Sequence, residues 1–135
     1  MILAAIFLVA AFAIHARGVS ARPAELRVTE RDFHISAPKQ VASGDVVVTV
    51  TNQGPDDHEL IIARATTARL PLRADGLTAN EQKLAPATVL SLEPAGPGSV
   101  RTARLHLEPG RYVLFCNMAG HFMAGMRTTL VVRSR

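Results

Sequence analysis

The residues best suited to bind a metal ion lie close together near the C-terminal end of the chain. They are Cys116, His121 and Met126, and four residues separate each from the next. This spacing fits one short loop, so the three side chains can surround a single point. His58 lies far away in the sequence, after a loop-forming run and before an apolar stretch, and it adds a second imidazole. Two imidazoles, a thiolate and a thioether form a soft nitrogen and sulfur ligand set that suits copper in both oxidation states.

The strands expected around these residues aim their side chains at a shared interior, because side chains alternate between the two faces of a strand. Each candidate lies an even number of positions from apolar residues of the same expected strand, so it shares their face. His58 shares a face with Leu60 and Ile62, Cys116 with Leu114 and Tyr112, and Met126 with Leu130 and Val132. We therefore predict that one copper ion is held by His58, Cys116 and His121, with Met126 as a long, weak axial ligand.

The other histidines are weaker candidates. His106 has the parity of Arg104, which is expected to face outward, and His34 is interpreted as structural. The single cysteine, Cys116, supports a bound ligand, because a free thiol in an exported protein is reactive unless something occupies it.

The loop between Cys116 and Met126 contains two more methionines. We interpret Met118 and Met123, together with Phe122, as an apolar rim around the exposed edge of His121. The alternative is that these residues only pack on one another within the loop.

Short strands separated by turn signals dominate the rest of the sequence. The prolines between positions 64 and 98 forbid long regular elements there, and one short helix over 77–84 is expected with Thr78 as its cap. The pattern predicts a single all-β sandwich domain over 25–135 with about seven strands. The expected strands cover 26–29, 32–36, 46–51, 58–63, 100–107, 111–116 and 126–132.

Several segments resemble those of cupredoxins, the small blue copper proteins. They are the run from Val48 to Gly54 before His58, the run from Leu107 to Cys116, and the pieces Gly120-His121 and Ala124-Gly125-Met126. The ligand spacing is nearest to rusticyanin-like and sulfocyanin-like members of the family. The resemblance implies a Greek-key β-sandwich that carries single electrons on one copper ion. One position departs from the family pattern, because Glu59 stands where many members have an asparagine that joins the two ligand loops.

The N-terminal residues indicate where the protein works. Residues 2–14 are apolar without interruption, so we interpret 1–16 as an export signal or an N-terminal anchor, and 17–24 as a flexible lead-in. The predicted location is the periplasm or another compartment outside the cytoplasm, and an anchor would tether the protein to the membrane.

Charge and composition narrow the class of partner. The formal net charge is +4, but no basic run is interleaved with aromatic residues, so nucleic acid binding is not expected. A redox protein such as a cytochrome or an oxidase is the expected partner of a monomeric electron carrier that is not an enzyme.

Two alternatives to an electron carrier remain. In the first, a periplasmic copper carrier or buffer binds copper(I) through Met118, Met123 and Met126. In the second, an enzyme keeps an open coordination position, with Glu59 as a ligand in place of Met126.

Overall fold

The computed structural model describes residues 22–65 and 69–135. The segment interpreted as an export signal or anchor, 1–16, lies outside the described residues, as does most of the lead-in over 17–24. The first strand begins at Ala24. Within the described residues, no helix is long and apolar enough to cross a membrane.

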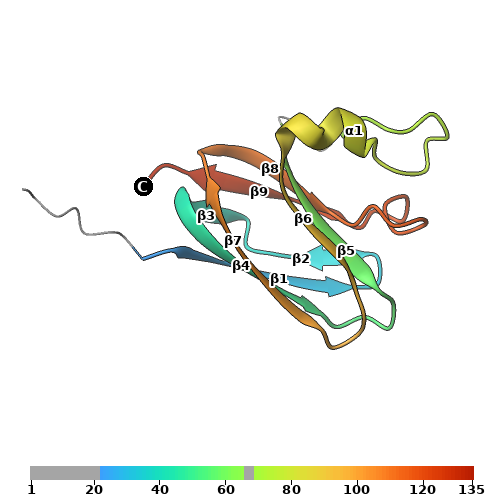
Figure 1. The fold of residues 1–135 in the computed structure, drawn as a ribbon, viewed down its shortest axis with the longest axis horizontal. Helices are drawn as coiled ribbons and strands as arrows, with labels where there is room; N and C mark the ends of the chain where they lie inside the picture. Colours follow the sequence, from blue (N-terminus) through green and yellow to red (C-terminus); the bar gives the residue numbers. More distant parts are fainter. Residues whose placement is uncertain (1–21, 66–68) are drawn as a thin grey trace, which may run out of the picture.

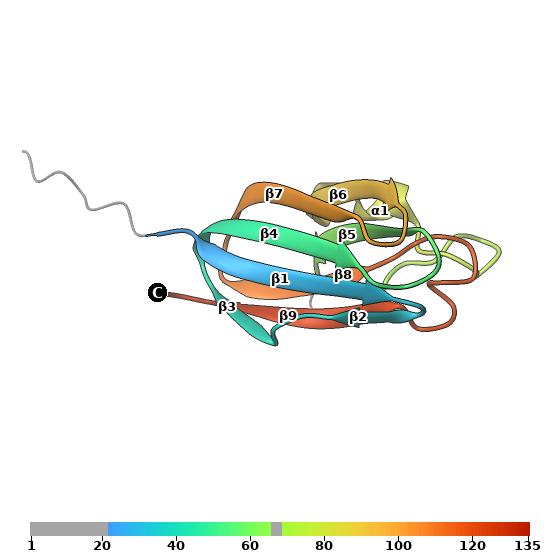
Figure 2. The same cartoon turned by 90° about the horizontal axis from the view of Figure 1, so that it is seen from below.

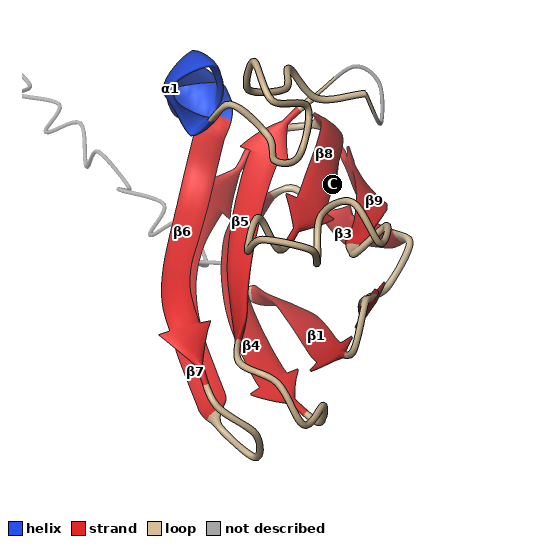
Figure 3. Ribbon diagram, turned by 90° about the vertical axis from the view of Figure 1, so that its right-hand side faces the viewer, coloured by secondary structure: helices blue, strands red, loops and turns tan. Residues whose placement is uncertain are grey.

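Two β-sheets form the two layers of a sandwich (Figure 3). One sheet has the strand order β2-β1-β4-β7 and the other has the order β3-β9-β8-β5-β6. The chain passes repeatedly from one sheet to the other, as the predicted Greek-key sandwich requires. The strands are β1 (Ala24–Arg31), β2 (His34–Ser36), β3 (Gln40–Ala42), β4 (Gly44–Asn52), β5 (His58–Arg64), β6 (Thr88–Ala95), β7 (Val100–Leu107), β8 (Gly110–Phe115) and β9 (Arg127–Arg133).

The interior between the sheets follows from the alternation of side chains along the strands. In β4, Val46, Val48 and Val50 are buried, whereas the residues between them are partly exposed. The matching faces of the other strands complete one continuous apolar core, which also includes Cys116 and Met126.

A second apolar cluster lies on the outer face of the five-stranded sheet. Helix α1 (Glu81–Leu84) and the segment before it cover this face (Figure 1), and Leu70 and Leu84 pack against Val113 and Phe115. Strands β5 and β8 are therefore buried on both faces, which explains their continuous apolar runs.

The described part of the chain has nine strands, two more than the sequence pattern predicts. Strand β3 is only three residues long and pairs in parallel with β9, so it carries little periodicity. Strand β6 contains Pro94, which a strand tolerates because β6 lies at the edge of its sheet.

The predicted helix is shorter than expected. It begins at Glu81, and its cap is Asn80, whose side chain accepts a hydrogen bond from the Lys83 N–H at 3.1 Å. Thr78 cannot be the cap because its carbonyl accepts the Arg73 N–H in a preceding turn.

A buried ion pair joins two strands of the four-stranded sheet. Glu30 on β1 is fully buried, and Arg101 on β7 donates a hydrogen bond to its carboxylate across β4. Burial raises the pKa of Glu30 to about 6, with Glu59 adding to the shift and Arg101 opposing it. The carboxylate is therefore costly to keep ionised in the folded protein, even with its partner.

This shift predicts how stability depends on pH. Because the folded protein binds the Glu30 proton more tightly than the unfolded chain, stability should fall as pH rises from 4.5 to about 6. The loss should be about 2 kcal/mol. In Glu30→Gln this part of the pH dependence should disappear, as measured by urea unfolding of both proteins at several pH values. Glu25→Gln, at an exposed position of the same strand, is the matched control. Parallel pH profiles for Glu30→Gln and the native protein would contradict the prediction.

Candidate metal centre

The predicted ligands lie at one end of the sandwich. Three connections meet at this end, on the opposite side from the C-terminus: the β1–β2 turn, the β4–β5 loop and the β8–β9 loop (Figures 1 and 2). His58 is the first residue of β5, Cys116 follows directly after β8, and Met126 directly precedes β9. His121 lies within the β8–β9 loop.

Two histidines and the cysteine face one another at this end. The Nδ1 atoms of His58 and His121 are 3.1 Å apart, and Sγ of Cys116 lies 3.6 Å from Nδ1 of His121. One potential ligand atom from each residue falls within 4.8 Å of the others, so the three side chains are placed to hold a metal ion. His58 and Cys116 are fully buried, whereas His121 is half-buried and keeps part of its ring accessible.

Met126 is fully buried in the same core cluster as Cys116. Its main chain joins two of the other residues: its carbonyl accepts the Cys116 N–H, and its own N–H donates to the His121 carbonyl, each at 3.1 Å. Backbone hydrogen bonds therefore join the two ends of the loop. The role of Met126 as an axial ligand stays a prediction.

The electrostatics of the centre suit a bound cation. Burial raises the pKa of the Cys116 thiol, although hydrogen bonds from the backbone N–H groups of Glu59 and Met118 oppose this shift. Burial also lowers the pKa of His58, and the charge of His121 lowers it further. A buried thiol next to two imidazoles, with the protonation of His58 disfavoured by burial, is a donor set that a metal cation would stabilise in its deprotonated form.

Glu59 joins the two ligand loops. Its Oε1 accepts the backbone N–H of Asn117, the residue after Cys116, at 2.9 Å. Its own backbone N–H donates to the Cys116 sulfur. The departure from the family pattern at this position therefore preserves the connection between the loops through a different side chain. Glu59 is not among the residues whose ligand atoms cluster at the centre.

Asn117 anchors the segment before helix α1 to the ligand loop, a role that the sequence pattern did not reveal. Its Oδ1 accepts the Ala79 N–H at 2.7 Å, and its Nδ2 donates to the Ala79 carbonyl at 3.1 Å and to Oε1 of Glu81 at 2.6 Å. This anchor fixes the segment before helix α1 to the first residue of the ligand loop.

The β1–β2 turn also contacts the centre. Oδ1 of Asp32 lies 3.6 Å from Nε2 of His58, the ring nitrogen that points away from the cluster. The Phe33 ring meets the His121 ring edge-on, with centroids 5.5 Å apart. The sequence pattern placed both residues in or beside a strand, and no spacing rule links them to the distant histidines.

The apolar rim expected around His121 is only partly present. Met123 is 56% exposed, and Met118 is half-buried against the main core. Phe122 is buried and packs against Phe115 in the second apolar cluster, so its assignment to the rim was wrong. Phe122 instead anchors the loop to the outer face of the sheet.

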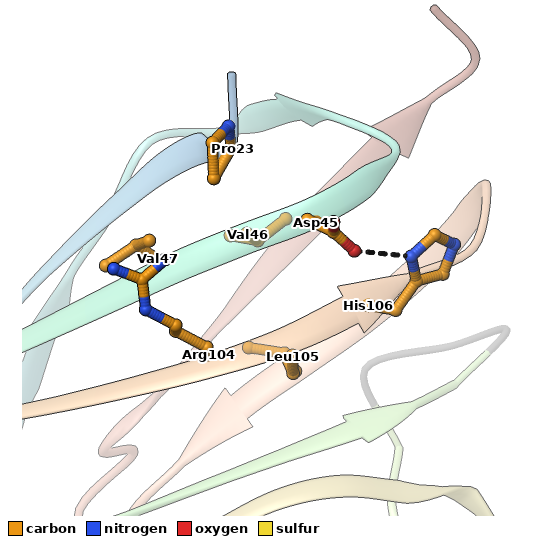
Figure 4. A pocket seen from close by; sticks show the side chains of 7 residues that line it. All are labelled: Pro23, Asp45, Val46, Val47, Arg104, Leu105 and His106. Atoms are coloured by element: carbon orange, nitrogen blue, oxygen red, sulfur yellow. Dashed lines mark hydrogen bonds and ion pairs between the residues drawn. The ribbon is translucent and has the colours of Figure 1, made fainter. Parts of the chain in front are cut away.

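His106 lies on the outward face, as its parity predicts, and its side chain is 59% exposed. Nδ1 of His106 is 2.9 Å from Oδ1 of Asp45 (Figure 4). Its Nε2 is 3.3 Å from Oε1 of Glu108. The hydrogen bond to Asp45 raises the pKa of His106. Asp45 and His106 border a hollow of about 330 Å³, and each ring nitrogen of His106 already faces a carboxylate. We interpret this group as a surface ion-pair cluster.

No known family model matches the sequence, and no curated protein matches it significantly. Solved structures do match the fold. An auracyanin from Roseiflexus castenholzii is 17% identical, with 81% of this chain and 96% of that chain covered and a TM-score of 0.62.

Two further structures agree. Rusticyanin from Thiobacillus ferrooxidans is 16% identical over 81% of this chain and 77% of that chain, with a TM-score of 0.60. Auracyanin A from Chloroflexus aurantiacus, described as a "blue" copper protein, is 13% identical over 83% of this chain and all of that chain, with a TM-score of 0.58. The all-β sandwich prediction is thereby confirmed, and the chain has the cupredoxin fold of auracyanin and rusticyanin.

Proposed function

We propose that the protein is a type 1 copper protein that transfers single electrons between redox partners outside the cytoplasm. The observation that carries this proposal is the meeting of two imidazoles and the lone thiol within 4.8 Å at one end of a cupredoxin fold. A bound copper ion would supply reversible one-electron chemistry between copper(II) and copper(I). His58, Cys116 and His121 would hold the ion, with Met126 as the weak fourth ligand.

The rigidity of the loop supports electron transfer. Five backbone hydrogen bonds brace the residues from Met118 to Met126, and Glu59 and Asn117 fix the loop to its neighbours. Ligands that cannot move far would bind both oxidation states in nearly the same arrangement, which lowers the reorganisation that accompanies electron transfer. The same bracing argues against the open, methionine-lined loop that a copper(I) carrier or buffer would use, since Met118 packs on the core and Met123 faces solvent.

The accessible part of His121 is the best route for an electron. Its ring is half-buried, and the exposed side chains of Phe33 and Met123 give this end an apolar character. A redox protein such as a cytochrome or an oxidase could approach closely here and leave quickly. We further propose that the protein works in the periplasm or a similar compartment, because the apolar run over 2–14 has the pattern of an export signal or anchor. We propose that it acts there as a monomer.

Copper titration of the purified protein tests this proposal. One equivalent of copper(II) should produce an intense visible absorption and a single spin-resonance signal, and both should disappear reversibly on reduction. A weakly coloured protein that binds copper(I) and yields it to chelators would favour the carrier instead. An absorption spectrum that changes on addition of azide would favour an open, enzyme-like site. Absence of stoichiometric binding would contradict all three functions.

A further inference from the structure

We propose that Asp32 is a positioning residue of the metal centre. It orients the His58 imidazole by facing its Nε2 atom, on the side away from His121, and it tunes the relative stability of the two copper oxidation states. This inference rests on the proposed copper site, but it concerns two residues outside the predicted ligand set, Asp32 and Gly54.

The first observation is a pair of buried polar atoms that face each other. Nε2 of His58 and Oδ1 of Asp32 are both buried, and neither has a hydrogen-bond partner within the described residues. They lie 3.6 Å apart, slightly beyond hydrogen-bonding distance. Nδ1 of the same imidazole faces His121 on the other side. A proton on Nε2 would be stabilised by the carboxylate and would leave Nδ1 free to bind a metal.

The second observation is the backbone of the neighbouring loop, which leaves room for this approach. A Cβ atom at Gly54 would lie 2.6 Å from Oδ1 of Asp32 and 2.9 Å from Nε2 of His58. Any larger residue at this position would therefore push the carboxylate and the imidazole apart. Glycine permits the loop to cover both groups and shield them from water.

The third observation is that two hydrogen bonds tie the end of β1, directly before Asp32, to the neighbouring loop. The Gln53 N–H donates to the Glu30 carbonyl at 2.8 Å, and the Arg31 side chain donates to Oε1 of Gln53 at 3.1 Å. These bonds connect the β1–β2 turn to the loop that carries Gly54. Phe33 has a positive φ of 57°, which is unusual for a bulky residue, and in this conformation its ring lies against His121.

The negative charge of Asp32 should have a measurable consequence. A nearby carboxylate stabilises the higher charge of copper(II) more than that of copper(I), so it should lower the reduction potential. The Asp32 side chain is 34% exposed, which weakens the effect through solvent screening. We therefore expect loss of the charge to change the copper affinity by about tenfold, the lower end of the range found when an outer-shell partner of a metal ligand is removed.

Asp32→Asn and Asp32→Ala test the proposal in the copper-loaded protein. Loss of the charge should weaken copper(II) binding about tenfold more than copper(I) binding. This tenfold difference corresponds to a potential about 59 mV higher. Asp32→Ala should also change the copper spin-resonance parameters, since the carboxylate that faces Nε2 of His58 would be gone. Asp45→Asn removes the same charge at the far end of β4 and is the matched control (Figure 4). Thermal unfolding of each metal-free variant checks that the fold is retained.

A second readout separates this proposal from the proposed function. Long-range proton–nitrogen spectra of the metal-free protein report which His58 nitrogen carries the proton in its neutral form. We expect Nε2 in the native protein and a mixture in Asp32→Ala. If the native protein bound no copper, the proposed function would fail and this tautomer measurement would still decide the role of Asp32. Native values of potential and tautomer in both Asp32 variants would overturn the inference while leaving the copper site intact.

Discussion

Replacement of Cys116 by serine should abolish the intense visible absorption of the copper-loaded protein. The absorption of a type 1 site comes from a short bond between copper and a thiolate, and serine has no thiolate to offer. No other residue could supply a thiolate, because Cys116 is the only cysteine in the sequence. The copper(II) dissociation constant should rise by more than the ~100-fold that loss of an outer-shell partner can cost. Visible spectroscopy and chelator competition on both proteins measure the two effects.

Two measurements show whether the effect belongs to the ligand. Met123→Leu removes a sulfur atom from the same loop, but at a 56% exposed position, so it should leave the colour unchanged. Metal-free Cys116→Ser should remain folded, because serine is smaller than cysteine and the surrounding strands are unaltered. A Cys116→Ser protein that kept the blue colour would refute the ligand assignment. A Met123→Leu protein that lost it would instead point to the loop methionines.

The sequence singled out the predicted metal ligands because local spacing and the alternation of side chains along strands both constrain them, and the structure brings His58, Cys116 and His121 together. Cys116, His121 and Met126 occur in one short stretch, and the structure keeps that stretch as a single loop between two adjacent strands. His58 was found by its parity with Leu60 and Ile62, which are indeed buried in the main core. Alternation along strands is a strong signal where one face of a sheet is buried.

The residues that support the centre were not predictable in this way. Asp32 and Gly54 meet His58 only because the β1–β2 turn and the β4–β5 loop reach the same end of the sandwich. Such meetings depend on tertiary structure, and a single sequence has no periodicity that records them. Strand β6 was missed for a related reason, since its Pro94 reads as a strand breaker unless the strand is known to lie at an edge.

Asn117 lies in the ligand loop that the local sequence identifies, but its contacts depend on tertiary structure. Its replacement should lower the free energy of unfolding more than the other substitutions proposed. It directly follows the predicted ligand Cys116, yet its partners lie 36 and 38 residues earlier in the chain. Asn117 and Ala79 are both buried, and the asparagine amide satisfies the backbone N–H and the carbonyl of Ala79. Few other side chains could satisfy a donor and an acceptor on the same residue.

In Asn117→Ala these two backbone groups would lose their partners. Each buried group left without a hydrogen bond costs about 1–3 kcal/mol, so the free energy of unfolding should fall by about 2–6 kcal/mol. The additional bond to Glu81 would also be lost, which should loosen the start of helix α1. Urea unfolding measures the total loss, and hydrogen exchange should locate it in residues 69–84.

Asn80→Ala is the matched control, because it removes only the helix cap that bonds to the Lys83 N–H. The loss of a single cap typically costs about 1 kcal/mol, so its effect should be clearly smaller. The backbone N–H of Asn117 that donates to Glu59 remains in the alanine variant, so the two ligand loops stay connected. Copper-loaded Asn117→Ala should therefore keep its colour while its fold is weakened. A loss below 1 kcal/mol would mean that water replaces the asparagine, and the segment over 69–80 would then not depend on the ligand loop for its position.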